Sequence, residues 1–179
     1  MTSMQIFILL CGLAAVLYGL ITSRQILSLS TGNEKMVGIA NAIQEGARAY
    51  LNRQYMTIGM VGIVIFAFIW FIFGLPSGIG FLIGAVFSGA AGYVGMNISV
   101  RSNVRTTQAA SSSLAEGLSV SFKAGAVTGM LVAGLALLSI SLYYFVLDNS
   151  GQFPGREIVA PLVSLGFGAS LISIFARLG

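Results

Sequence analysis

The chain has 179 residues, of which 56% are apolar and 8% charged; nine are Lys or Arg, five are Asp or Glu, and none is His. Because a soluble domain carries about a quarter charged residues, this composition excludes a disordered chain, a nucleic-acid-binding arm and an ordinary soluble enzyme. It indicates a polytopic membrane protein, and the lack of His excludes His-based catalysis and His-ligated metal sites.

The first predicted element is an apolar stretch at about residues 4–23, which contains no charge and is followed by Arg24. A helix of about 20 apolar residues is long enough to cross a bilayer. A cleaved signal peptide is the alternative, but such a peptide has a basic segment before its apolar part. We therefore expect a retained membrane-spanning helix.

Residues 24–56 form a polar segment with apolar residues at helical spacing. Thr31-x-x-Glu34 has the pattern of a capping box. We therefore expect a helix that begins at about Asn33 and continues into the second span, with its charges on a solvated face.

The second and third spans lie in the 47 consecutive uncharged residues between Arg53 and Arg101. Gly74-Leu75-Pro76-Ser77 has the composition of a turn. The predicted spans are therefore about 57–74 and 78–100.

The last two spans follow from two further uncharged stretches, and we place them at about 122–147 and 158–178. Pro161 falls near the start of the fifth span, where proline is tolerated. The predicted fold class is all-α: residues 1–179 form a single membrane domain with five transmembrane helices.

Small residues recur within the last three spans and predict close helix packing. Small residues four apart share a helix face and let another backbone approach closely. They are Gly80, Gly84, Ser88 and Gly92 in the third span, Gly125, Gly129 and Ala133 in the fourth, and Gly166 and Ser170 in the fifth.

Basic residues predict the orientation, since cytoplasmic loops are enriched in Lys and Arg. Segments 24–56 and 101–121, with the adjoining Lys123, carry seven basic residues, whereas the external loops carry one, Arg156. We expect these two segments in the cytoplasm and the N-terminus outside. The lack of a basic presequence favours a prokaryotic plasma (inner) membrane.

The acidic residues do not suggest a metal-binding active site within this chain. No two of them are close enough in sequence to suggest a shared site, whereas Mg²⁺ bound to phosphate needs several clustered oxygen ligands. The five are Glu34, Glu45, Glu116, Asp148 and Glu157. Either an active site lies in sequence beyond this chain, or the protein is not an enzyme. A fragment of a secondary transporter and a small non-enzymatic membrane protein are both open alternatives.

Four segments carry a resemblance to the membrane-integral, ion-translocating inorganic pyrophosphatases. They are residues 42–58 (AIQEGARAYLNRQYMTI), 84–106 (GAVFSGAAGYVGMNISVRSNVRT), 125–138 (GAVTGMLVAGLALL) and 165–179 (LGFGASLISIFARLG). They occur in the family's order along almost the whole chain. The first two segments and the ending Phe175-Ala-Arg-Leu-Gly179 are the most specific.

The resemblance implies the N-terminal fragment of a larger helical pump, which couples pyrophosphate hydrolysis to the translocation of protons, or of sodium, across a membrane. Its implied partners are the lipid bilayer, pyrophosphate, H⁺ or Na⁺ and a second subunit in a homodimer, with no nucleic acid. Mg²⁺ is the implied cofactor of the intact enzyme. The catalytic, substrate-binding and metal residues would lie beyond this chain, so the fragment alone would be inactive. Arg177 matches a family arginine of the ion transport pathway.

Overall fold

A computed structural model describes the backbone of residues 3–153 and 155–177, and the side chains of these residues up to 174. Its elements are α1 (Ser3–Leu27), α2 (Glu34–Phe73), α3 (Leu75–Ser112), α4 (Leu114–Asn149), a short 3-10 helix η1 (Gly155–Ile158) and α5 (Val159–Arg177). No strand occurs in these ranges. Five helices, the last counted with η1, are long and apolar enough to cross a membrane. The predicted all-α class with five transmembrane helices is confirmed.

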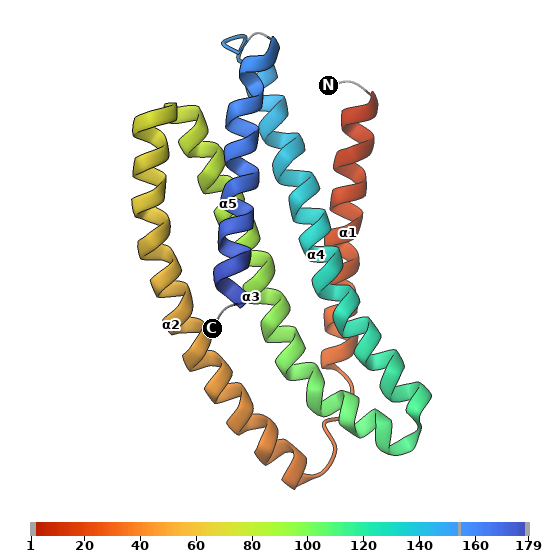
Figure 1. The fold of residues 1–179 in the computed structure, drawn as a ribbon. Coiled ribbons are helices and arrows are strands. Elements are labelled where there is room, and N and C mark those ends of the chain that lie inside the picture. Colours follow the sequence, from red (N-terminus) through yellow and green to blue (C-terminus); the bar gives the residue numbers. More distant parts are fainter. Residues whose placement is uncertain (1–2, 154, 178–179) are drawn as a thin grey trace.

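The three middle helices are much longer than a membrane span. At 1.5 Å per residue, the 40 residues of α2 extend about 60 Å, roughly twice the hydrocarbon thickness of a bilayer. The α1–α2 connection and the α3–α4 turn lie at one end of the bundle, whereas the α2–α3 turn, residues 150–153 and η1 lie at the other (Figure 1). The basic segments therefore share one end. The membrane boundaries along each helix remain predictions.

The start of α2 matches the prediction, but its cap does not. The helix begins at Glu34, and the Asn33 side chain accepts a hydrogen bond from the Met36 N–H at 3.0 Å. The predicted capping box at Thr31 is wrong because the residue immediately before the helix, at the N-cap, is Asn33. Gly32, at a φ of +79°, separates Thr31 from it. An Asn side chain in this position satisfies an amide that has no partner within the helix.

The turn between α2 and α3 is shorter than predicted. Gly74 alone joins the two helices, with φ +84° and ψ 167°, and its N–H donates to the Trp70 carbonyl at 3.0 Å. Leu75, Pro76 and Ser77 already belong to the first turn of α3, where proline fits because the first helical amides have no partner. A glycine adopts this positive φ at no steric cost, so one residue reverses the chain.

Helix α3 is the centre of the bundle. It packs against α2, α4 and α5, while α1 packs mainly on α4. One buried cluster joins α1, α3 and α4 through Ile26, Ile98 and Val127. A second joins α4 and α5 through Tyr143, Leu147 and Leu165. Helices α4 and α5 thus both pack against α3, and they also contact each other through the second cluster.

Candidate functional site

The contact between α3 and α5 is built from glycine. A Cβ on Gly84 would overlap the Leu165 carbonyl, and one on Gly80 would overlap the Pro161 carbonyl. From the opposite side, Gly168 faces the Phe81 carbonyl in the same way. Side chains at these positions would separate the two backbones, so the glycines allow α5 to lie directly on α3.

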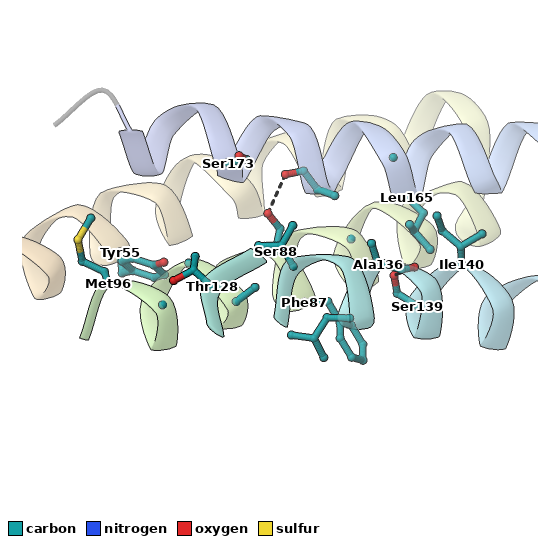
Figure 2. A pocket seen from close by; sticks show the side chains of 18 of the residues that line it. Tyr55, Phe87, Ser88, Met96, Thr128, Ala136, Ser139, Ile140, Leu165 and Ser173 are labelled. Carbon is teal, nitrogen blue, oxygen red and sulfur yellow. Dashed lines mark hydrogen bonds between the residues drawn. The ribbon is translucent and has the colours of Figure 1, made fainter. Parts of the chain in front are cut away.

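Polar contacts extend the same face of α3. Ser88 donates a hydrogen bond to the Ala169 carbonyl of α5 at 2.8 Å, the dashed line in Figure 2. A Cβ on Gly92 would lie 2.9 Å from the hydroxyl of Tyr55 in α2. The prediction that the Gly80, Gly84, Ser88 and Gly92 face packs against other helices is confirmed: α5 covers its first three residues and α2 the last.

Arg177, the one site residue predicted from the sequence, is the last residue of α5. Its side chain lies outside what the structure describes. Because α5 is seated on α3 by backbone-to-backbone contact, the position of its last turn is set by the glycine contact. Helix α5 ends well short of the end that α2, α3 and α4 reach (Figure 1). The role of Arg177 stays a prediction.

A groove lies beside this contact, between α4 and α5, with α3 as its floor. The cavity has a volume of about 430 Å³. Figure 2 shows Ser88 of α3 between Ser173 of α5 and Ser139 of α4. Its described lining is small or apolar, with hydroxyls but no charged side chain. The hydroxyl-bearing residues are Tyr55, Ser88, Ser99, Thr128, Ser139 and Ser173.

The acidic residues form no metal site. In the described ranges, no group of three His, Cys, Asp or Glu side chains lies close enough together to hold a metal ion. Mg²⁺ requires an oxygen-ligand set that can complete an octahedron. The described residues therefore offer no such cluster of ligands for a metal ion.

Arg105 has a structural contact that the sequence analysis missed, having counted it only as a cytoplasmic charge. Its guanidinium donates from Nη2 to the Leu27 carbonyl at the end of α1, at 2.9 Å, and from Nη1 to the Arg101 carbonyl, at 2.6 Å. Burial, and next the positive charge of Arg101, lower the pKa of Arg105 from its usual range. A cation at a helix C-terminus is favourable. No local pattern signals a contact between residues 78 positions apart.

The small residues of α4 divide between two faces. Gly134 packs on α1, where its Cβ would lie 2.8 Å from the Gly12 carbonyl and 3.0 Å from the Ala15 side chain. By contrast, a Cβ on Gly125 or Gly129 would have nothing within 4 Å in the described part of the chain. The α1–α4 contact thus uses Gly134, which the sequence analysis did not single out. The predicted face of Gly125, Gly129 and Ala133 has no helix against it here.

The family model and the relatives that this chain matches are all described as pyrophosphatases or pyrophosphate-driven pumps. A family model described as "Inorganic H+ pyrophosphatase" matches residues 13–179. A "K(+)-insensitive pyrophosphate-energized proton pump" of Methanosarcina mazei is 45% identical over 172 residues, covering 95% of this chain and 24% of that protein. A pump of the same name from Pyrobaculum aerophilum is 39% identical over 186 residues, covering 100% of this chain and 25% of that protein.

A third relative carries a different ion in its name. The "Putative K(+)-stimulated pyrophosphate-energized sodium pump" of Bacteroides thetaiotaomicron is 37% identical over 169 residues, covering 87% of this chain and 23% of that protein. The chain therefore spans about a quarter of the length of these relatives.

Proposed function

Because the chain belongs to the inorganic H⁺ pyrophosphatase family, we propose that it is the N-terminal quarter of a pump that couples pyrophosphate hydrolysis to ion translocation. The observation that carries this proposal is similarity to proteins named as such pumps along nearly the whole chain, on a bundle of five helices that can span a membrane. The chain is an integral membrane protein. Protons are the proposed ion, since two of the three relatives described above are named proton pumps, and sodium is the alternative.

In this proposal the residues of this chain hold the helices in position and take no part in pyrophosphate hydrolysis. Hydrolysis needs groups that bind Mg²⁺ and pyrophosphate, and the described carboxylates do not gather for that purpose. Those groups belong to the rest of the pump. The role of α3 is then to hold α5 in place, so that Arg177 meets the ion pathway. A positive charge there would stabilise a nearby carboxylate in its charged form.

Location, orientation and assembly are part of the same proposal. A prokaryotic plasma membrane, an external N-terminus and a homodimer are expected. The position of both basic segments at one end of the bundle supports the orientation (Figure 1). That end faces the cytoplasm if the positive-inside rule holds for this chain.

The test is ion transport by a full-length protein that carries these residues, in sealed inside-out vesicles. Adding pyrophosphate with Mg²⁺ should acidify the vesicle interior, and a protonophore should abolish the gradient. Residues 1–179 expressed alone should release no phosphate above background. If the full-length protein cleaves no pyrophosphate, or if the 179-residue chain cleaves it with turnover that follows it through purification, the proposal fails. Na⁺ uptake into the vesicles that a protonophore enhances, with an interior that becomes alkaline rather than acidic, would indicate sodium transport.

A further inference from the structure

Two arginines from different helices share one cleft at the basic end of the bundle. Arg48 of α2 and Arg101 of α3 line it together with the amide side chains of Gln44 and Asn97, and we call it the arginine cleft. Both arginines are exposed. In the described part of the chain neither guanidinium has a hydrogen bond or an ion pair, although Glu45 precedes Arg48 by three residues. Two cations therefore line the same cleft without a carboxylate partner.

The electrostatic setting of the arginine cleft favours an anion. Burial, and next the positive charge of Arg101, lower the pKa of Arg105, so Arg101 is close enough to a second cation for repulsion between them. A negative charge beside Arg101 would offset this repulsion. The Asn97 amide donates one N–H to the Tyr93 carbonyl at 2.9 Å and keeps a second N–H free to donate. Guanidinium and amide donors of this kind bind phosphate oxygens well.

The depth of the arginine cleft matches the headgroup layer of a bilayer. Arg101 directly follows the predicted span 78–100. About two helical turns farther into the membrane, Tyr93 of α3 packs edge to face on Tyr55 of α2, with ring centroids 5.4 Å apart. Tyrosine side chains concentrate where a membrane meets water. The two arginines beyond this tyrosine pair therefore lie where lipid phosphates are found.

An apolar groove continues from the arginine cleft into the membrane along the same two helices. Asn97 of the cleft is followed one turn on by Tyr93 of the groove, and Leu51 of the cleft by Tyr55 and Ile58 of the groove. Steps of three or four residues stay on one face of a helix. The groove has a volume of about 570 Å³, and its described lining has no charged side chain. A pair of cations above an apolar groove matches the two parts of a phospholipid.

The size of the arginine cleft favours a lipid over a soluble anion. Its volume is only about 10 Å³, so a phosphate would lie against its mouth and would not be enclosed. A soluble phosphate would gain only these exposed contacts, whereas a lipid adds the burial of its acyl chain in the groove. The negative surface potential of a leaflet rich in anionic lipids also concentrates such lipids near basic residues.

We propose that the arginine cleft binds the phosphate of an anionic phospholipid, with Arg48 and Arg101 as its ligands and an acyl chain in the groove between α2 and α3. The positive-inside rule accounts for basic residues on this side of the membrane. It does not require two arginines without acidic partners to line one cleft that opens onto an apolar groove. The proposal goes beyond the proposed function and does not depend on pyrophosphate hydrolysis.

The test is lipid binding to the purified full-length protein, measured by native mass spectrometry. Phosphatidylglycerol and phosphatidylcholine with the same acyl chains are titrated separately. The first phosphatidylglycerol should bind more tightly than the first phosphatidylcholine, and Arg48→Gln and Arg101→Gln should each weaken its binding about fivefold. Phosphatidylcholine binding should change much less. Phosphatidylglycerol binding that is unchanged in both variants would overturn the proposal.

The matched control is Arg53→Gln. It removes the same charge from α2, but Arg53 is exposed and lines neither the arginine cleft nor the groove. This variant should bind phosphatidylglycerol as the parent does. An equal weakening in all three variants would mean that overall charge attracts the lipid, and would remove the site.

A soluble analogue separates the two sources of phosphate. Glycerol phosphate carries the anionic group without acyl chains. Phosphatidylglycerol should raise the melting temperature of the full-length protein, and glycerol phosphate at the same concentration should not. Equal stabilisation by both would identify a soluble-anion site and overturn the assignment to a lipid.

A measurement on the unmodified protein decides even if a variant fails to fold. Phosphatidylglycerol with a photoactivatable diazirine in its acyl chain should label α2 or α3 within the groove, and more strongly than the matching phosphatidylcholine. Labelling confined to other helices would overturn the proposal. Pyrophosphate-driven transport is measured separately, so a protein that pumps without this lipid preference keeps the proposed function and loses only the lipid site.

Discussion

At the scale of single residues, Arg177 carries the most specific functional prediction. Its guanidinium stays charged at any working pH, and charges in membrane spans are costly and commonly functional. In the full-length protein, both Arg177→Ala and Arg177→Lys should lose ion pumping, with hydrolysis reduced or left uncoupled, since Lys keeps the charge but lacks the planar fork. The measurement is ions moved per pyrophosphate hydrolysed in sealed vesicles. A normal ratio in Arg177→Ala would reduce this residue to an interfacial anchor.

Arg105 leads to a prediction about stability rather than transport. Arg105→Ala removes the hydrogen bond to the Leu27 carbonyl and should cost about 1 kcal/mol, which is below the roughly 1.5–3 kcal/mol typical of a charged donor because the side chain is partly exposed. Thermal unfolding of the full-length protein in detergent measures it. The matched control is Arg101→Ala, which removes an exposed arginine one turn away. An equal loss in both variants would mean that the charge matters and the contact does not.

At the scale of elements, the α3–α5 contact is the joint on which the position of α5 depends. Its two helices meet through carbonyls and glycine Cα atoms, with no side chain between them at Gly84 and Gly168. Such a contact cannot yield to a larger residue without moving a whole helix, because backbone atoms do not change rotamer.

Gly84→Ala should destabilise the full-length protein by about 1–3 kcal/mol, and Gly84→Leu by more, because the added Cβ overlaps the Leu165 carbonyl. Gly59→Ala is the control, since a Cβ on Gly59 of α2 has nothing within 4 Å. That substitution should be neutral or stabilise by up to about 1 kcal/mol through helix propensity. Thermal stability in detergent compares the two. If Gly84→Ala and Gly59→Ala behave alike, α5 does not rest on Gly84.

At the scale of the whole molecule, orientation in the membrane is the property most open to a direct test. Ser112 is the last residue of α3, and Ser150 directly follows α4; both serines are exposed. The α3–α4 turn and the C-terminal end of α4 lie at opposite ends of the bundle (Figure 1), so the two serines should lie on opposite sides of the membrane. In a Cys11→Ala background, an impermeant thiol reagent outside intact cells should label Ser150→Cys at once and Ser112→Cys only after permeabilisation. The reverse labelling pattern would invert the topology derived from the positive-inside rule.

The sequence by itself determined the number and the type of the helices that are long and apolar enough to cross a membrane. Apolar length, charge placement and the start of a helix near Asn33 are local properties, and they can be read within a few residues. The sequence also located one face of α3 that packs closely, because Gly80, Gly84, Ser88 and Gly92 fall four residues apart. Similarity to one family connected the chain to pyrophosphate-driven pumps.

Only the tertiary structure decided which faces meet. Gly125 and Gly134 look alike in sequence, yet Gly134 lies against α1 and Gly125 lies open. The Arg105–Leu27 contact and the seating of α5 on α3 join segments 78 or more residues apart. Apolar residues have no preferred partner along the chain, since a lipid tail and a neighbouring helix are equally apolar. Helix pairing in a membrane therefore depends on the fit of two distant surfaces, which spacing within one helix does not encode.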